Sequence, residues 1–423
     1  MDWMISSLEP FPNIRRAKAD PARSQPVRSP LKHEINQRKP IYVVWELTMR
    51  CDHACGHCGS RASKPRENEL TTAELLGVAE SLIALGTREV TLIGGEVYLR
   101  PDTPEIIAKL SENGIRVAIQ TGGLGMSERV LNKYIEAGLH GLGVSIDGTE
   151  KVHDLQRRRQ GSFAGAMRTI QLARAAGLTV SCNTQINKLS LPVLKDTIEA
   201  VRRAGVNAWR PQLTVPMGRA ADWPDILLQP ADVVTLLDEL AAIKTEHLQD
   251  PKIRMDYESG FFSISLGNNV GYYGPHEQFL RSAISENAFW QGCSAGKFTM
   301  GIESDGKIKG CPSLPTAPYV GGNVRDLSLK EIWENSAEVK QVVSQRKEDL
   351  SGFCRTCHYA DVCKGGCSFT THCFFGKRGN NPYCYHRVKK MASRGVSEQV
   401  HQIKKADGQP YDFGQFAIRE VTL

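Results

Sequence analysis

The stretch Cys51-Asp52-His53-Ala54-Cys55-Gly56-His57-Cys58 places three cysteines within eight residues. It follows shortly after the apolar run Ile41-Tyr42-Val43-Val44-Trp45, which is typical of a buried strand. Three thiolates on one loop can hold three irons of a four-iron cluster and leave the fourth iron without a protein ligand. An iron with an open position can bind and activate a small molecule. The stretch therefore predicts a reactive iron site, around which much of the remaining chain would be arranged.

A structural zinc site is the alternative, because thiolates bind zinc as well as iron–sulfur clusters. Such a site needs a fourth ligand, which His53 or His57 could supply. The neighbouring segments favour the iron site, because glycine-rich and acidic loops follow three further expected strands. A structural zinc needs none of these loops. We therefore interpret the cysteine loop as part of a ligand-binding site.

Length and composition are those of an ordinary globular enzyme. The chain has 423 residues, which predicts two or three domains. Hydrophobic residues make up 41% and charged residues 23%. No apolar run approaches the roughly eighteen residues of a membrane span, and no secretory signal is visible, so we expect a cytoplasmic protein with no membrane partner. The net charge of +7 is mild and calls for no nucleic-acid partner.

The chain holds twelve cysteines, and nine of them fall in two groups, Cys51 to Cys58 and Cys354 to Cys384. In a reducing compartment, such groups bind metal more often than they form disulfides. Cys182 stands alone in an expected strand, and we interpret it as a buried apolar residue. The grouping of the nine clustered cysteines predicts that they bind metal.

Short apolar runs alternate with helical patterns between residues 41 and 213. We expect strands at 41–47, 89–93, 116–120, 141–146, 178–183 and 207–213, and helices at 71–85, 104–111, 127–137, 163–176 and 191–204. Thr71 and Glu74 form a capping box at the first helix, and a glycine follows each helical pattern. This alternation implies parallel strands with right-handed crossovers, in either an open doubly wound sheet or a partial barrel.

The unusual residues all follow expected strands. The cysteine loop follows the first strand, Gly94-Gly95-Glu96 the second, Gln120-Thr121-Gly122-Gly123 the third and Ser145-Ile146-Asp147-Gly148 the fourth. In both candidate folds, ligands bind at the carboxyl ends of the strands. We therefore expect these residues to meet in one site.

In this order, the motifs resemble those of the radical S-adenosylmethionine (radical SAM) enzymes. Cys51, Cys55 and Cys58 match the three cluster ligands in the spacing Cys-x3-Cys-x2-Cys. The resemblance implies that other matched positions contact SAM, namely His57, Gly94, Gly95, Glu96, Ser145, Asp147 and Arg157, and we expect Thr121 beside them. His57 would lie near the adenine, Glu96 at the methionine amino group and Arg157 at the methionine carboxylate.

Two positions depart from the family pattern. Val97 stands where a proline is usual, and Arg158 stands where a glycine is common. The second departure leaves open which residue of the run Arg157-Arg158-Arg159 acts at the site.

The resemblance also implies a fold and a reaction. The fold is α/β, a partial (β/α)6 TIM-like barrel followed by a small cysteine-rich, loop-rich domain with auxiliary clusters. The open iron binds SAM, and one electron from the cluster cleaves SAM to a 5′-deoxyadenosyl radical, which takes a hydrogen atom from the substrate. A flavodoxin or ferredoxin would supply the electron.

The second cysteine region has the spacing Cys293-x12-Gly306-x4-Cys311, then Cys354-x2-Cys357-x5-Cys363-x3-Cys367 and a later Cys384. This pattern resembles the SPASM extension, which holds two auxiliary four-iron clusters, so that the chain would hold three [4Fe–4S] clusters. By the resemblance, Cys293, Cys311 and Cys367 hold the first auxiliary cluster, and Cys354, Cys357, Cys363 and Cys384 the second. Two zinc sites are the alternative.

The first of these two sets is one ligand short. The resemblance leaves three possibilities: an open iron, a ligand from Cys373, or a ligand from a side chain other than cysteine. An open iron could bind substrate, whereas a closed cluster would relay electrons.

SPASM enzymes mostly modify peptides or proteins, so a ribosomal peptide or protein side chain is our leading hypothesis for the substrate. The product would carry a crosslink, an oxidation or a decarboxylation. A tetrapyrrole or small metabolite is the second hypothesis, and a metal scaffold without turnover is the third. Residues 1–40 are too short and proline-rich for a leader-recognition domain, so a separate protein or the groove between the domains would recognise a leader peptide.

We expect five regions: an irregular arm (1–40), the barrel (41–230), a bridging region (231–290), the SPASM domain (291–390) and a charged tail without a motif (391–423). No motif identifies a catalytic acid or base. Asp256, Tyr257, Glu258, Glu303 and Asp305 lie in regions that could face the cavity, although such residues are more often on surfaces or in turns.

Overall fold

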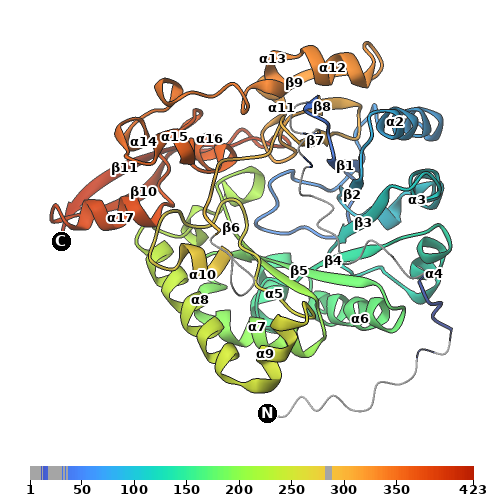
Figure 1. Ribbon diagram of the computed structural model, residues 1–423, viewed down its shortest axis with the longest axis horizontal. Coiled ribbons are helices and arrows are strands. Elements are labelled where there is room, and N and C mark those ends of the chain that lie inside the picture. Colours follow the sequence, from blue (N-terminus) through green and yellow to red (C-terminus); the bar gives the residue numbers. More distant parts are fainter. Residues whose placement is uncertain (1–10, 12, 18–30, 32–33, 35–36, 282–287) are drawn as a thin grey trace.

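The computed structural model describes residues 11, 13–17, 31, 34, 37–281 and 288–423 (Figure 1). The expected irregular arm, 1–40, therefore lies mostly outside the described residues. The strands form one nine-stranded sheet in the order β6-β5-β4-β3-β2-β1-β7-β8-β9 and a separate two-stranded sheet of β10 and β11. Within the described ranges, no helix is long and apolar enough to cross a membrane.

Six parallel strands form the barrel part of the large sheet, and each pairs with its neighbour in sequence. They are β1 (Tyr42–Thr48), β2 (Glu89–Gly94), β3 (Arg116–Thr121), β4 (Gly141–Ser145), β5 (Thr179–Ile186) and β6 (Ala208–Leu213). The partial barrel is confirmed, and the expected strands differ from the observed ones only at their ends. This order is the one that successive right-handed crossovers produce.

Helices cover the outer face of these strands (Figure 1). They are α2 (Thr72–Ala84), α3 (Thr103–Glu112), α4 (Glu128–Glu136), α5 (Glu150–Arg157), α6 (Ser162–Ala175) and α7 (Leu194–Arg203). The expected helices are confirmed, but α5 was not expected as a separate helix. Its buried residues are His153, Gln156 and Arg157, so it has no apolar stripe for a sequence pattern to detect.

Local signals fix the ends of the helices. The capping box of Thr71 and Glu74 is present at α2. The glycines expected after the helices have φ angles of 75° to 93°, which residues with a Cβ atom avoid; they are Gly86, Gly114, Gly138, Gly177 and Gly205. Because these residues mark the helix ends, the sequence predicted the positions of the helices between the strands closely.

Each barrel strand has one apolar face toward the helices and one face toward the barrel interior. On β1, Val43, Trp45 and Leu47 are fully buried, whereas Val44 and Glu46 line the interior cavity. Cys182 on β5 is fully buried, as expected. Because side chains alternate along a strand, the interior positions are free to carry polar residues.

The cysteine-rich region continues the barrel sheet. Its strands β7 (Thr299–Ile302), β8 (Lys307–Lys309) and β9 (Val320–Asn323) follow β1, and β7 runs parallel to β1 with Tyr42 opposite Thr299. The sheet is therefore continuous across the expected boundary at residue 291. This pairing places the second cysteine region against the first.

The remaining described helices lie in the bridging region and the cysteine-rich region. The bridging region contains α8 (Asp232–Gln249), α9 (Pro251–Glu258) and α10 (Glu277–Arg281). The cysteine-rich region contains α11 (Thr316–Tyr319), α12 (Leu329–Asn335), α13 (Ala337–Lys340), α14 (Phe353–Thr356), α15 (Ala360–Cys363), α16 (Ser368–Phe375) and α17 (Tyr385–Ala392). The 3-10 turns are η1 (Val97–Leu99), η2 (Leu191–Val193), η3 (Gly218–Ala220), η4 (Pro224–Ile226) and η5 (Lys347–Asp349).

The expected charged tail, residues 391–423, contains secondary structure that no motif indicated. The strands β10 (Val396–Lys404) and β11 (Gln415–Thr422) form an antiparallel hairpin. Val400 and Phe416 are buried in the same core as the barrel strands. The sequence concealed the hairpin because residues 405–414 connect its strands, which is much longer than the two-residue turns that give a clear signal.

We predict that Ile119→Ala will lower the free energy of unfolding by about 2–5 kcal/mol, because it leaves a cavity in the core. Ile119 lies on β3 and is fully buried. Urea unfolding followed by circular dichroism measures the change. Leu155→Ala, on an exposed part of α5, is the control and should change stability little. Equal effects of the two substitutions would contradict the assigned core.

Candidate active site

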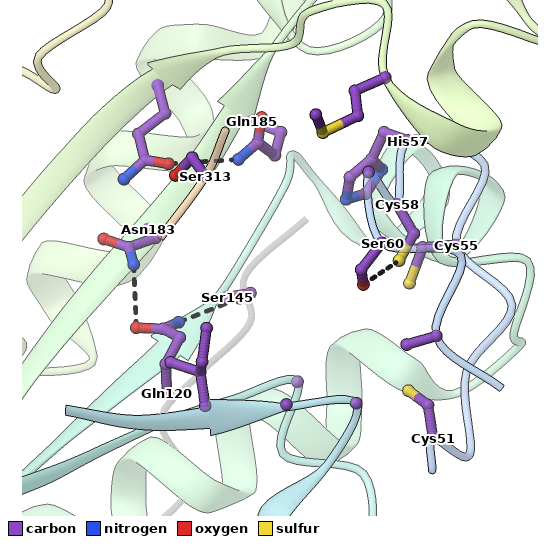
Figure 2. Close-up of a pocket in the computed structure, with 18 of the residues that line it drawn as sticks. Cys51, Cys55, His57, Cys58, Ser60, Gln120, Ser145, Asn183, Gln185 and Ser313 are labelled. Atoms are coloured by element: carbon purple, nitrogen blue, oxygen red, sulfur yellow. Dashed lines mark hydrogen bonds between the residues drawn. The ribbon is translucent and has the colours of Figure 1, made fainter. Parts of the chain in front are cut away.

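A cavity of about 380 Å³ lies at the carboxyl ends of the barrel strands (Figure 2). Every residue expected at the SAM site lines it: Cys51, Cys55, His57, Cys58, Gly94, Gly95, Glu96, Thr121, Ser145, Asp147 and Arg157. These residues come from the cysteine loop, the ends of β2, β3 and β4, and α5. The structure therefore brings together residues that the sequence spreads over more than a hundred positions.

Backbone hydrogen bonds hold the cysteine loop in place. The amide of Cys51 donates to Ser63 O at 3.0 Å, and that of Gly56 donates to Gln156 O at 2.8 Å. Burial, reinforced by the neighbouring thiols, raises the pKa of Cys51 to about 12. The metal-free Cys51 thiol therefore keeps its proton, and a metal that binds here must displace it.

Glycines allow the end of β2 to pack directly on the start of the cysteine loop. A Cβ atom on Gly94 would lie 2.3 Å from Thr48 O, and one on Gly95 would lie 2.1 Å from Arg50 O. The amide of Gly95 donates to Thr48 O at 2.7 Å. These contacts leave no space for a side chain at either position. Gly94 and Gly95 thus allow the end of β2 to lie in direct contact with the start of the cysteine loop.

Glu96 is buried at the base of the cavity. Its carboxylate accepts hydrogen bonds from Thr121 Oγ1 at 2.5 Å and from the amide of Gly122 at 2.6 Å. Burial raises the pKa of Glu96 to about 7, although both hydrogen bonds oppose the shift. A cationic ligand group would favour the ionised form. The site thus offers a fixed carboxylate to an amino group.

Asp147 and Arg157 form a buried ion pair beside the cysteine loop. Arg157 Nη2 lies 2.7 Å from Asp147 Oδ2, and Arg157 Nη1 donates to Cys55 Sγ at 3.7 Å. Burial would raise the pKa of Asp147, but Arg157 and His57 outweigh burial and hold it at about 2. Of the three consecutive arginines, Arg157 is the one that lines the cavity.

His57 is buried and carries an unused nitrogen. Its Nε2 lies 3.4 Å from Asp147 Oδ2, and its Nδ1 has no hydrogen-bond partner among the described residues. Burial lowers the pKa of His57 to about 4, so the ring is neutral at physiological pH. A neutral ring with a free nitrogen suits contact with a ligand in the cavity.

A second, smaller cavity is lined by four cysteines, Cys354, Cys357, Cys363 and Cys384. These are the four expected ligands of one auxiliary cluster. Burial and the three other thiols raise the pKa of Cys363. Four converging thiols match the ligand set of a four-iron cluster or of a zinc ion.

A third group contains Cys293, Cys311 and Cys367, the expected ligands of the other auxiliary cluster. Burial and the thiols of Cys311 and Cys367 raise the pKa of Cys293 to about 12. Pro312 and Ser313, which follow Cys311, and Phe369, close to Cys367, line the large cavity. This third group therefore adjoins the active-site cavity.

Family models match both parts of the chain. The model described as radical SAM superfamily matches residues 45–202, and the model described as iron-sulfur cluster-binding domain, SPASM, matches residues 293–358. The chain is a radical SAM protein with a SPASM domain. SAM and iron–sulfur clusters are therefore its cofactors.

Relatives of this radical SAM protein carry two kinds of name. An AdoMet-dependent heme synthase of Methanosarcina barkeri is 29% identical over 83% of this chain and 98% of its own length. The mycofactocin maturase MftC of Mycobacterium ulcerans is 28% identical over 78% of this chain and 83% of its own length. Streptococcus suis SuiB bound to S-adenosylmethionine shares the fold, with a TM-score of 0.62, 16% identity and coverage of 80% of this chain and 76% of that chain.

Five carboxamides also line the cavity of this radical SAM protein, and apart from Gln120 none of them belongs to a motif of the sequence: Gln120, Asn183, Gln185, Gln212 and Asn269. Figure 2 shows Gln120 and Asn183 across the cavity from the three cysteines. Asn183 Nδ2 donates to Gln120 Oε1 at 2.9 Å, and Gln120 Nε2 donates to Ser145 Oγ at 3.1 Å. Asn183 and Gln185 occupy alternate positions of β5, which face the interior. The alternation of polar residues with the buried residues Val180, Cys182 and Ile186 along β5 is the signal that could have identified them.

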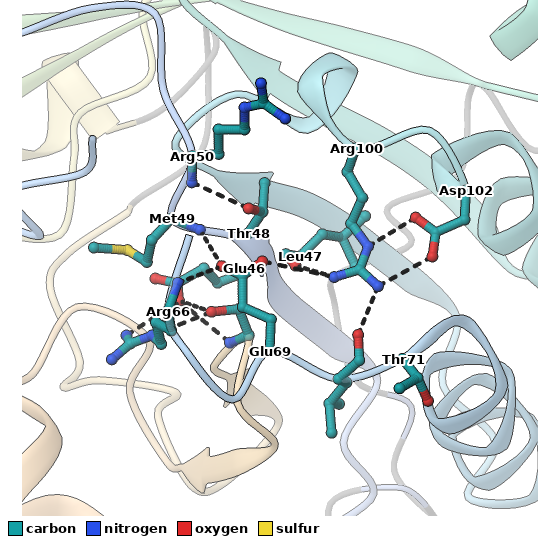
Figure 3. A network of polar contacts seen from close by, with 12 residues as sticks. Glu46, Leu47, Thr48, Met49, Arg50, Arg66, Glu69, Thr71, Arg100 and Asp102 are labelled. Atoms are coloured by element: carbon teal, nitrogen blue, oxygen red, sulfur yellow. Dashed lines mark hydrogen bonds and ion pairs between the residues drawn. The ribbon is translucent and has the colours of Figure 1, made fainter. Parts of the chain in front are cut away.

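The tail contributes Tyr411 to the same cavity. Its hydroxyl donates to Glu46, which also accepts from Arg66 Nη2 at 3.1 Å. Figure 3 shows the Arg66–Glu46 pair beside β1. Two cations lie over the ring of Tyr411: Lys309 Nζ is 4.8 Å from the ring centroid, and the guanidinium carbon of Arg66 is 5.5 Å from it. No sequence motif marked Glu46 or Tyr411.

The five residues named as possible acids or bases do not line the cavity. Asp256, Tyr257 and Glu258 lie on α9, where Tyr257 contacts His247 Nδ1 at 3.1 Å. Glu303 lies 2.6 Å from Lys309 Nζ, and Asp305 lies 2.6 Å from Lys307 Nζ. The expectation that they could face the cavity is therefore wrong, because each is engaged elsewhere.

We predict that Gly95→Ala will prevent assembly of the cluster at the cysteine loop, because the new methyl group must displace Arg50 and Cys51. Its Cβ atom would lie 2.1 Å from Arg50 O and 2.8 Å from Cys51 Cβ. Iron content after anaerobic reconstitution should fall by about four irons per chain. Gly77→Ala is the control, because nothing lies within 4 Å of its Cβ position. Full iron content in Gly95→Ala would contradict the packing argument.

Proposed function

We propose that this radical SAM protein binds SAM in the large cavity, at a [4Fe–4S] cluster held by Cys51, Cys55 and Cys58, and that it modifies a peptide or protein side chain. The observation that supports the first part is the convergence of all expected residues on one cavity. Three thiols on one loop leave room for a cofactor on the fourth iron.

The chain's own residues would bind and orient the cofactor. Cluster and SAM together supply a 5′-deoxyadenosyl radical able to abstract hydrogen from carbon. Glu96, fixed by Thr121 and Gly122, would accept the methionine amino group. Neutral His57 would contact the adenine, and Ser145 would bind a polar edge of the cofactor. Gly94 and Gly95 would allow close approach at the end of β2.

Arg157 has a further role in this proposal. Its guanidinium is committed to Asp147 and reaches Cys55 Sγ at 3.7 Å. A cation that donates a hydrogen bond to a ligating sulfur favours the reduced cluster. Arg157 would thus tune the cluster as well as attract the methionine carboxylate.

We propose two auxiliary [4Fe–4S] clusters in the SPASM domain, one at Cys354, Cys357, Cys363 and Cys384, the other at Cys293, Cys311 and Cys367. The cavity at the first four thiols supports the former. The proximity of the others to Pro312 and Ser313 supports a site within electron-transfer reach of the substrate. A flavodoxin or ferredoxin would be the external donor.

The five carboxamides of the cavity, here called the carboxamide wall, support a peptide substrate. Gln120, Asn183, Gln185, Gln212 and Asn269 are uncharged and carry both donors and acceptors, which match the amide groups of a peptide. Arg157, the one cation among the described residues that line the cavity, is paired with Asp147. A tetrapyrrole with several carboxylates would need cations at this wall.

The size of the cavity also supports a peptide substrate. A volume of about 380 Å³ is near the lower end for small-molecule sites, which range over roughly 300–1,000 Å³. SAM would occupy much of it. The remaining space suits one side chain, with the rest of the peptide outside. A separate protein would then recognise any leader segment.

A tetrapyrrole substrate is the second candidate. It is favoured by the AdoMet-dependent heme synthase of Methanosarcina barkeri, which this chain matches over 98% of that protein's length. In this case only the edge of the macrocycle would enter the cavity, and its carboxylates would lie outside the carboxamide wall.

We predict that the reduced protein will cleave SAM to 5′-deoxyadenosine and that Cys55→Ala will abolish this activity. Liquid chromatography of anaerobic reactions measures the product. Cys182→Ala is the matched control, because Cys182 is an equally buried thiol in β5 away from the loop. Undiminished cleavage by Cys55→Ala would overturn the assignment. No cleavage by the wild type would favour a metal scaffold without turnover.

Mass spectrometry should distinguish the two substrate classes. We expect a mass change in a peptide encoded beside the gene, when it is incubated anaerobically with protein, SAM and reductant. Conversion of an iron-bearing tetrapyrrole carboxylate, with every candidate peptide unchanged, would instead establish the second candidate.

A further inference from the structure

Tyr411 lines the active-site cavity, although it lies in the connection between β10 and β11, far from the barrel in sequence. Its backbone has a φ angle of 59°, in the left-handed region that residues with bulky side chains rarely occupy. Such a conformation persists only where surrounding contacts hold it, and it is concentrated at functional sites. The backbone of Tyr411 is therefore held in an unfavourable conformation that places its ring at the cavity.

Contacts with the segment after the cysteine loop hold the connection in place. The carboxylate of Asp412 accepts from Arg61 Nε at 2.8 Å, and the amide of Gly218 donates to Asp412 O at 2.7 Å. Arg61 closely follows Cys58 in sequence, and its amide donates to Cys58 O at 3.4 Å. The residue next to Tyr411 is thus fixed to the segment that carries the three cysteines.

Glu46 on β1 fixes the direction of the Tyr411 hydroxyl. The hydroxyl donates to Oε2 of Glu46. The other carboxylate oxygen, Oε1, accepts from Arg66 Nη2 at 3.1 Å and from Ser304 Oγ at 2.9 Å (Figure 3 shows the Arg66 pair). Burial and the carboxylates of Glu46 and Glu303 raise the pKa of Tyr411, so the phenol keeps its proton. Because an ionised carboxylate can only accept, the phenolic proton points at Glu46.

The oxygen of Tyr411 is consequently an acceptor with no proton left to donate. A phenolic oxygen that donates one hydrogen bond can still accept another. Within the described residues, no donor bonds to this oxygen, and both Tyr411 and Glu46 line the cavity. A ligand in the cavity can therefore supply the missing donor.

The charges around the Tyr411 ring balance one another. Lys309 Nζ lies 4.8 Å from the ring centroid and 2.6 Å from Glu303. The guanidinium carbon of Arg66 lies 5.5 Å from the centroid, and its Nη2 lies 3.1 Å from Glu46. Two cations and two carboxylates leave no net charge to attract an ionic group. A neutral donor suits this arrangement better than an ammonium group, which the two cations would repel.

We propose that Tyr411, oriented by Glu46, is a substrate-binding residue that accepts a hydrogen bond from a neutral donor of the substrate: a peptide N–H, a carboxamide or a hydroxyl. Glu46 acts through Tyr411 and is a positioning residue. This inference rests on the proposed function, which places the substrate in this cavity. It favours a peptide substrate, because the carboxylates of a tetrapyrrole have no proton to donate.

The test compares two small amides that differ by one donor. N-methylacetamide carries an N–H group, and N,N-dimethylacetamide carries a methyl group in its place. Saturation-transfer NMR titrations measure the binding of each amide to the full-length protein, reconstituted with iron and sulfide and loaded with SAM. We expect the wild type to bind N-methylacetamide roughly two- to tenfold more tightly, which corresponds to one neutral hydrogen bond.

Two variants identify the group responsible for this preference. Tyr411→Phe removes the acceptor and should remove the preference. Glu46→Gln should reverse the hydrogen bond, because its carboxamide can donate to the Tyr411 oxygen and free the hydroxyl to donate into the cavity. Glu46→Gln should therefore bind N,N-dimethylacetamide roughly two- to tenfold more tightly than the wild type does, whereas Tyr411→Phe should not.

Tyr42→Phe is the matched control. Tyr42 also lies on β1, and its hydroxyl lies 3.1 Å from Thr91 Oγ1, but it does not line the cavity. This variant should keep the preference of the wild type.

Equal binding of the two amides by the wild type, including no detectable binding of either, would overturn the inference. An unchanged preference in Tyr411→Phe would do the same, and so would equal losses for both amides, which would assign a structural role to the hydroxyl. Because the titrations require no turnover, their outcome is separate from the tests of SAM cleavage and of product formation.

Discussion

The buried pair of Asp147 and Arg157 is the interaction on which the site depends. Asp147 follows β4, and its carboxylate accepts from Arg157 Nε at 2.7 Å and from the amide of Gln185 on β5 at 2.9 Å. Arg157 at the end of α5 reaches Cys55 in the cysteine loop. A buried carboxylate without this partner would cost several kcal/mol. The pair thus ties two strands, a helix and the loop into one arrangement.

Two chemically different sets of residues line opposite sides of the cavity. On one side are the cysteine loop and the glycines at the end of β2. On the other side are carboxamides from β3, β5 and β6 and the Glu46–Tyr411 contact. Relatives named for heme synthesis and for peptide maturation have similar identities to this chain. The chemistry of the second side therefore carries more information about substrate than overall similarity does.

Parallel-strand geometry explains which parts were predictable from the sequence. Gly94, Glu96 and Asp147 were placed in one site because parallel strands present their carboxyl ends at one edge. The residues missed depend on contacts between distant segments. Tyr411 reaches the cavity only because the hairpin packs on the barrel, where Asp412 pairs with Arg61 Nε at 2.8 Å. The pairing of β7 with β1 is equally remote in sequence, and no local pattern marks it.

The most direct test of the account is whether the amino group of SAM binds the cluster at the cysteine loop. SAM labelled with ¹⁵N in its methionine part can be added to the reduced protein and examined by electron–nuclear double resonance. We expect a ¹⁵N coupling to the cluster that is absent in Cys58→Ala and retained in Cys182→Ala. Absence of the coupling in the wild type with all clusters present would contradict it.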